Sequence, residues 1–96
     1  MKRDEVLQLL ASHSADLHAR GVRSLSLFGS VARDAAADRS DIDLLVEFDR
    51  AVGLFAFIDL RDYLQHVLGQ RVDLVTPEAL RPQLRERILA EAVRAA

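Results

Sequence analysis

Hydrophobic side chains along this chain switch between helical and strand spacing, with polar residues at each change. Residues 3–20 place apolar side chains at intervals of three and four, which predicts an amphipathic helix that ends at Gly21. Residues 22–28 alternate apolar and polar side chains and predict a strand. Residues 41–48 contain a nearly unbroken apolar run, which is typical of a strand buried on both faces.

The second half of the chain predicts two helices around a third strand. Residues 54–68 predict a long helix that ends at Gly69, and residues 71–75 predict the strand. Thr76 and Pro77 form a helix-start signal. Pro82 restarts the helix, because the residue before a proline avoids helical geometry. The last helix is expected to bury three aliphatic side chains: Leu84, Ile88 and Leu89.

A short helix is expected between the first two strands. Gly29 ends the first strand, Ser30 is a good N-cap for a helix over residues 31–37, and residues 38–40 form a polar connection. The predicted order is αβαβαβα, an α/β arrangement with helices packed on a small sheet. A chain of 96 residues, half of them hydrophobic, predicts a single domain spanning residues 1–96.

Composition narrows the classes of function. The chain has no cysteine, which excludes a disulfide framework and a thiolate metal site. It contains neither a signal-peptide pattern nor an apolar run approaching the ~18 residues of a membrane span, so a cytoplasmic location without membrane contact is expected. Its net charge of −2 argues against direct binding to nucleic acid, which needs a basic face.

Acidic side chains concentrate around the second strand, with six between Asp34 and Asp49 against one basic residue. Asp41 and Asp43 are two positions apart, so on a strand their side chains point to the same face. Asp73 lies on a strand that can pair with theirs. Two such charges 4 Å apart repel by roughly 4 kcal/mol unless a cation or a proton relieves them. The pattern therefore predicts a site for a divalent cation, and Mg²⁺ takes oxygen ligands of this kind.

Gly29 and Ser30 are suited to hold a phosphate. Glycine allows close approach to the backbone, the free N–H groups at a helix start attract anions, and the serine hydroxyl can donate a hydrogen bond. Arg33 lies in the same short helix, within reach of a phosphate. Structural alternatives remain open for these residues: a strand cap for Asp41, a salt bridge for Asp43, a pair with Arg71 or a nearby arginine for Asp73, and a pair with Asp34 or Asp38 for Arg33.

These motifs resemble the signature of the minimal nucleotidyltransferases of the DNA polymerase beta superfamily. That signature is Gly-Ser, then Asp-x-Asp, then a single Asp on another strand, and here it reads Gly29-Ser30, Asp41-Ile42-Asp43 and Asp73. The flanking residues agree as well, in particular Ser40 to Val46. One departure is Asp34, where many members have glycine after the arginine.

The resemblance implies a nucleotidyltransferase core, an α/β (α+β) fold with a small mixed sheet of three or more strands. It implies that Asp41, Asp43 and Asp73 are catalytic and bind two Mg²⁺ ions, and that the nucleotide is held by Gly29, Ser30, Arg33 and Ser40. ATP is the implied substrate. Members of this length are typically antitoxins that add AMP to a tyrosine of a HEPN-type ribonuclease toxin. The implied partners are that toxin and a nucleoside triphosphate, in a hetero-oligomer or a homodimer.

Two other functions stay open at this point. The chain can neutralise a toxin by binding alone, or it can modify a small molecule, although relatives that do so usually carry an extra helical domain. The helix over residues 54–68 has more apolar area than one core face needs, so it is either a contact surface or a helix buried on several sides. Tyr63 and the histidines are interpreted as structural: His13, His18 and His66.

Overall fold

A computed structural model of the chain describes residues 1–35 and 40–96. Its mixed sheet has the order β3-β2-β1-β4, formed by β1 (Val22–Phe28), β2 (Ile42–Phe48), β3 (Val72–Val75) and β4 (Val93–Arg94). β2 is parallel to β3 and antiparallel to β1, and β4 is antiparallel to β1. The mixed sheet flanked by helices confirms the predicted fold class, and the short strand β4 is an addition to it.

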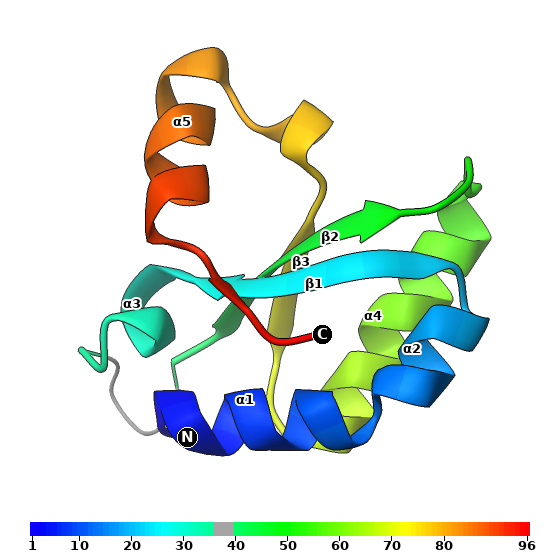
Figure 1. Cartoon of the computed structure of the whole chain (residues 1–96), viewed down its shortest axis with the longest axis horizontal. Coiled ribbons are helices and arrows are strands. Elements are labelled where there is room, and N and C mark those ends of the chain that lie inside the picture. The colour runs from blue at the N-terminus through cyan, green and yellow to red at the C-terminus, as the bar shows by residue number, and fades with distance from the viewer. Residues whose placement is uncertain (36–39) are drawn as a thin grey trace.

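Three helices cover one face of the sheet: α1 (Arg3–Ser12), α2 (Ser14–Ala19) and α4 (Leu54–Leu68) (Figure 1). Alternate residues of β2 point toward these helices and are fully buried. The core that they share consists mainly of aliphatic side chains: Val6, Leu10, Leu17, Leu25, Leu27, Ile42, Leu44, Val46, Leu60, Leu64, Leu68 and Leu74. The other face of β2 carries the half-buried Asp43 and Glu47 on either side of the buried Leu45.

The prediction of a single helix over residues 3–20 is wrong in one respect, because the helix breaks at His13. The Ser12 hydroxyl donates to the Leu9 carbonyl at 2.7 Å, and His13 Nδ1 lies 2.8 Å from the same oxygen. These side chains compete for a carbonyl that a continuous helix uses for its own backbone. The His13 N–H instead bonds to the carbonyl of Leu10, which ends α1.

The last two helical segments begin at Pro77 and Pro82, as predicted, but the second of them is less buried than predicted. A 3-10 turn, η1, spans Pro77–Ala79, and α5 spans Pro82–Glu91. The prediction that α5 buries three aliphatic side chains is wrong, since Leu84 is 45% and Leu89 is 47% exposed. The reason is its position: α5 lies on the side of the sheet away from α1 and packs chiefly against α3 (Gly29–Ala32) (Figure 1).

The short helix α3 follows β1 without a connecting loop. Gly29 has a positive φ of 78°, which turns the chain directly out of the strand. Phe28 is consequently the N-cap, so the prediction that Ser30 caps this helix is wrong, and Ser30 lies in the first turn. The helix predicted over residues 31–37 is too long, because α3 ends at Ala32 with Arg33 as its C-cap and residues 33–35 are not helical. The other residues of that prediction, and all of the polar connection except Ser40, lie outside the described residues.

Asp34 adopts a backbone conformation that favours glycine, with φ of 54°. This is the position at which the sequence departs from the glycine of many family members. The Asp34 carboxylate accepts a hydrogen bond from the Arg3 N–H at 3.3 Å and pairs with the Arg3 guanidinium at 3.8 Å. Aspartate is thus held in this conformation by a contact with the start of α1.

We expect Asp34→Ala to lower the free energy of unfolding by about 1 kcal/mol, because alanine carries a β-carbon without the polar compensation of aspartate. Asp34→Gly should change it by less than half as much, since glycine adopts positive φ freely. Chemical denaturation of the two variants beside the parent protein measures the difference. Equal losses would show that the Arg3 contact, and not the backbone conformation, determines the effect.

Candidate functional site

The sheet places the three predicted aspartates together at one end of β2 and β3. Asp43 and Asp73 are partners in the register of these parallel strands. Asp41 immediately precedes β2, two positions before Asp43. Ile42 and Leu44 are fully buried on the helix-covered side, so the alternation of the strand directs Asp43 to the other side. The prediction that the third strand lies beside the second is confirmed.

Asp43 is half-buried, and its surroundings oppose a negative charge. Burial raises the pKa of Asp43 from 3.8 to about 6, and the neighbouring charges of Asp73 and Asp41 act in the same direction. Within the described residues, no salt bridge reaches Asp43 or Asp73. The salt bridges considered as alternative roles for Asp43 and Asp73 are therefore not formed with any of the described residues.

The donor chemistry of this face fits magnesium, because carboxylate oxygens are the ligands that this ion takes. As the side chains stand, no three acidic or histidine residues within 1–35 and 40–96 are close enough to hold one ion. Asp41 and Asp73 are exposed and have room to rotate, whereas Asp43 is half-buried. Asp41, Asp43 and Asp73 thus form an open carboxylate face, in which Asp43 is the least exposed side chain.

Gly29 packs directly against the carboxylate of Asp43. A β-carbon added to Gly29 would overlap Asp43 Oδ2 and would come within 3.0 Å of Asp43 Cγ. Together with the positive φ, this contact leaves room for glycine alone. The Gly-Ser turn and the aspartates, which are separated in the sequence, are thereby joined in one site. Ser30 and Ser40 flank it and are both half-buried.

Glu91 is a neighbour of the site that the sequence did not predict. Glu91 Oε1 accepts hydrogen bonds from the backbone N–H of Gly29 at 3.3 Å and from Arg33 Nη1 at 3.1 Å. Of the two partners expected for Arg33, Asp34 pairs with Arg3 instead, and Asp38 lies outside the described residues. No sequence signal identifies this contact, because Glu91 and Arg33 are 58 residues apart in the chain.

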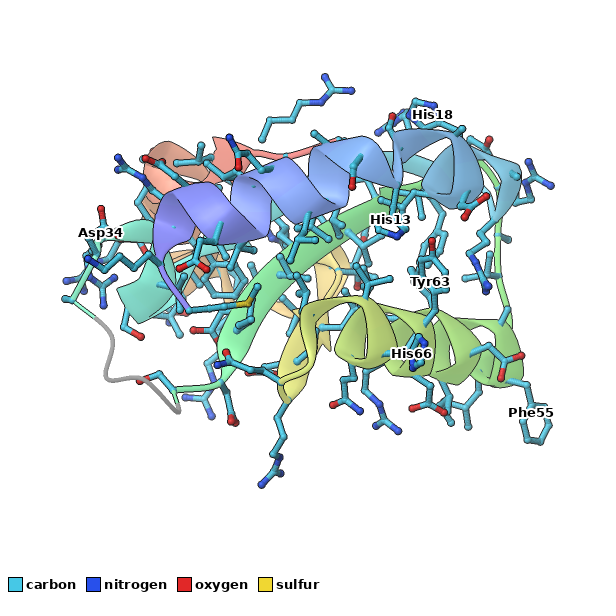
Figure 2. All side chains as sticks on the ribbon, turned by 90° about the horizontal axis from the view of Figure 1, so that it is seen from below. His13, His18, Asp34, Phe55, Tyr63 and His66 are labelled. Carbon is cyan, nitrogen blue, oxygen red and sulfur yellow. The ribbon has the colours of Figure 1, made fainter. Side chains whose placement is uncertain are left out.

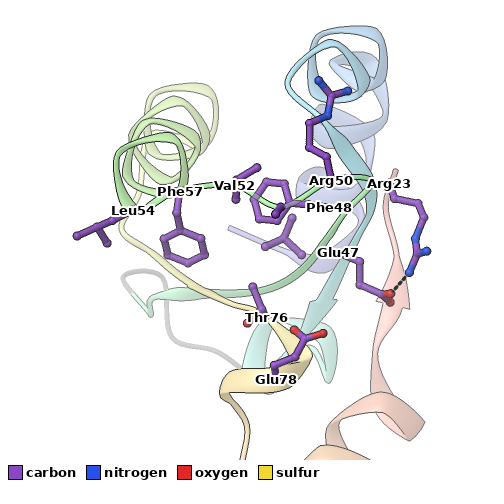
Figure 3. Close-up of a pocket in the computed structure, with 12 residues that line it drawn as sticks. Arg23, Glu47, Phe48, Arg50, Val52, Leu54, Phe57, Thr76 and Glu78 are labelled. Carbon is purple, nitrogen blue, oxygen red and sulfur yellow. Dashed lines mark hydrogen bonds and ion pairs between the residues drawn. The ribbon is translucent and has the colours of Figure 1, made fainter.

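A separate cavity of about 500 Å³ lies toward the other end of β2 (Figure 3). It is bordered by the last residues of β2, the start of α4 and η1, and its aromatic side chains are Phe48 and Phe57. None of the three aspartates lines it. Its acidic lining residues are Glu47, which pairs with Arg23, and Glu78. The aspartates that share a register lie at the other end of β2, so we place the candidate chemistry there.

The helix over residues 54–68 is buried along one part of α4 and exposed at its start, and its role as a contact surface stays a prediction. Leu60, Leu64 and Leu68 are buried in the core, whereas Leu54 is 69% and Phe55 is 83% exposed. Figure 2 shows Phe55 pointing away from the protein and Tyr63 pointing toward the neighbouring helices. The Tyr63 hydroxyl donates to Asp16 at 3.1 Å, so Tyr63 has a structural contact, as predicted. Among the described residues, no helix is long and apolar enough to cross a membrane.

Comparison with known proteins gives matches over nearly the whole chain. The family model described as "nucleotidyltransferase domain" matches residues 6–95. Protein adenylyltransferase MntA of Thermococcus cleftensis is 40% identical over 91 residues, covering 94% of this chain and 92% of that protein. A protein of Methanocaldococcus jannaschii described as a protein adenylyltransferase is 45% identical over 73 residues, covering 76% of this chain and 78% of that protein.

Solved structures agree with these matches. A structure described as a minimal nucleotidyltransferase superimposes with a TM-score of 0.84 and 35% identity, covering 97% of this chain and 95% of that one. A toxin–antitoxin crystal structure with AMP-PNP superimposes with a TM-score of 0.72 and 20% identity, covering 100% of this chain and 73% of that one. At that identity, the second likeness concerns the fold alone.

Proposed function

The chain belongs to the nucleotidyltransferase domain family, and we propose that it transfers AMP from ATP to a hydroxyl group of a partner protein. The observation that carries the proposal is the packing of Gly29 against the half-buried Asp43, with Asp73 in register beside it. One short stretch of surface thus combines backbone suited to a phosphate with carboxylates suited to a divalent cation. The relatives named protein adenylyltransferase support a protein as the acceptor.

The proposed site divides into two groups of residues. Asp41, Asp43 and Asp73 would hold two Mg²⁺ ions, with the exposed Asp41 and Asp73 rotating toward the half-buried Asp43. Gly29, Ser30, Arg33 and Ser40 would hold the triphosphate through N–H, hydroxyl and guanidinium donors. When bound, magnesium supplies the charge neutralisation that the phosphates and the acceptor oxygen need.

The reaction forms a bond between the acceptor oxygen and the α-phosphorus and breaks the bond from that phosphorus to the oxygen of the leaving pyrophosphate. The acceptor hydroxyl loses its proton, and Asp73 is the proposed carboxylate to take it. The turn at Gly29 and Ser30 orients the pyrophosphate for departure. Catalysis consists mainly of positioning the reactants and of stabilising charge, since no residue becomes covalently bonded to the nucleotide.

A HEPN-type ribonuclease toxin is the proposed partner, with a tyrosine as the acceptor, and the chain would act as its antitoxin. Structures with the same fold include toxin–antitoxin complexes, one of them a tri-AMPylated HEPN toxin with its MNT antitoxin. The exposed Leu54 and Phe55 at the start of α4 offer apolar surface for a protein contact.

Intact-mass spectrometry of the toxin tests this function. The protein is incubated with a HEPN-type toxin encoded beside it, ATP and Mg²⁺, and the toxin is weighed before and after. We expect a mass increase of one or more AMP units, loss of the increase with EDTA, and loss with Asp73→Asn. Asp59→Asn, an exposed aspartate of α4, is the matched control and should retain transfer. A tight complex without any mass increase would contradict the enzymatic proposal and favour neutralisation by binding alone.

A further inference from the structure

Glu91, the last residue of α5, places a carboxylate on groups that the proposed function assigns to the nucleotide. Its Oε1 accepts from the Gly29 N–H at 3.3 Å, and its two oxygens lie 3.1 and 3.2 Å from Arg33 Nη1. Carboxylate and phosphate oxygens compete for the same N–H and guanidinium donors. A triphosphate bound to Gly29 and Arg33 would therefore take donors that Glu91 occupies in this structure.

The charge of Glu91 also acts on the carboxylate face itself. Among the causes that raise the pKa of Asp43, burial and the charges of Asp73 and Asp41 are larger, but Glu91 contributes in the same direction. Glu91 thus adds negative charge at a place where a triphosphate brings more. Its presence disfavours nucleotide binding unless its side chain moves away.

The attachment of α5 allows such a movement. None of its residues is buried, and Leu84 and Leu89 are both about half exposed. At its start, the Arg85 guanidinium donates to the carbonyls of Pro77 and Leu80 at 2.9 and 3.2 Å. At its end, the ion pair with Arg33 joins side chains that are 56% and 30% exposed. Elements with few buried apolar contacts open at low cost, and exposed ion pairs are weak.

Resting on the proposed function, we infer that Glu91 is an internal competitor of the nucleotide: its carboxylate occupies the phosphate position in the free protein, and the triphosphate displaces it. Nucleotide binding then releases the end of α5 from Arg33 and Gly29. The C-terminal helix thereby becomes a reporter of whether the nucleotide site is filled.

Calorimetric titration with inorganic tripolyphosphate and Mg²⁺ tests the competition without the base or the reaction. Glu91→Gln keeps an acceptor for the Gly29 N–H but loses the charge, and it should bind tripolyphosphate about fivefold more tightly than the parent protein. Glu86→Gln removes the same charge from an exposed position of the same helix and should bind as the parent does. Equal or weaker binding by Glu91→Gln would overturn the inference, since a residue that positions Arg33 for the phosphate gives that result.

Hydrogen–deuterium exchange of the parent protein gives a second measurement that needs no variant. Amides over residues 82–91 should exchange faster with tripolyphosphate bound than without it. Unchanged or slower exchange there would count against displacement, whatever the variant does.

Failure of the two proposals can be told apart. A parent protein that binds neither tripolyphosphate nor a non-hydrolysable ATP analogue overturns the proposed function and this inference together. A parent protein that adenylylates its partner, while Glu91→Gln binds tripolyphosphate no more tightly, overturns the inference alone.

Discussion

Asp43→Asn is expected to lower AMP transfer by about a thousandfold while making the metal-free protein more stable. Activity is lost because the half-buried Asp43 carboxylate is a proposed ligand of the magnesium ions and also packs against Gly29, which is proposed to hold the triphosphate. The gain in stability follows from electrostatics. Asparagine fills nearly the same volume without the charge that burial and the neighbouring aspartates oppose.

The pH dependence of stability gives the sign and size of this effect. Because the pKa of Asp43 rises from 3.8 to about 6 on folding, the folded state binds the proton more tightly than the unfolded state. Protonation therefore stabilises the protein at low pH, and that contribution is lost as the pH rises from about 4 through 6. Allowing for solvent screening of a half-buried group, Asp43→Asn should gain about 1–2 kcal/mol at neutral pH and lose this slope.

Denaturation between pH 4 and 8, with and without Mg²⁺, measures both consequences. Magnesium should raise the unfolding temperature of the parent protein and leave that of Asp43→Asn unchanged, because an ion that binds only the folded state stabilises it. Glu47→Gln, further along the same face of β2, is the matched control and should keep the magnesium response. Substantial activity in Asp43→Asn would remove this residue from the proposed site.

Gly29→Ala is expected to lower both the free energy of unfolding, by about 2–4 kcal/mol, and the transfer rate, by about a hundredfold. Alanine at φ of 78° is strained, and its β-carbon would overlap the Asp43 carboxylate. The aspartate must then shift, and with it the geometry between the carboxylates and the Gly-Ser turn. Thermal or chemical denaturation and the mass-based transfer assay measure the two losses.

Gly69→Ala separates the two causes of the stability loss, which are the backbone strain at positive φ and the overlap with the Asp43 carboxylate. Gly69 also has a positive φ, of 67°, but an added β-carbon there meets nothing within 4 Å. That variant should cost only the backbone strain, roughly 1 kcal/mol, and should keep full transfer. Equal stability losses at the two glycines would mean that the contact between Gly29 and Asp43 has no energetic consequence.

The sequence predicted most of the elements because local pattern decides them. The alternation in β1, the apolar run in β2 and the glycine at the end of α4 are each readable within a few residues. The wrong predictions concern interactions that the pattern does not encode. The break at His13 depends on side chains competing for one carbonyl, and the exposure of α5 depends on which element it packs against.

The candidate site was predictable in its residues and only partly in its geometry. The pairing of Asp43 with Asp73 could be expected, since two strands carrying lone carboxylates in apolar runs favour a shared site. The contact between Gly29 and Asp43 requires the actual turn out of β1. The position of Glu91 on Arg33 requires the path of the chain after β3, which no local pattern specifies.

By itself, the sequence determined the mixed α/β architecture, the family and the residue types of the proposed site, because periodicity and motif spacing act over short stretches of chain. Only the tertiary structure decided which charges face each other. It brought the Asp43 carboxylate against Gly29, where there is no room for a side chain, and it brought Glu91 of the last helix onto Arg33 at the end of α3. Distant segments meet through the packing of the whole sheet and its helices, and that packing is a property of the complete core rather than of any one segment.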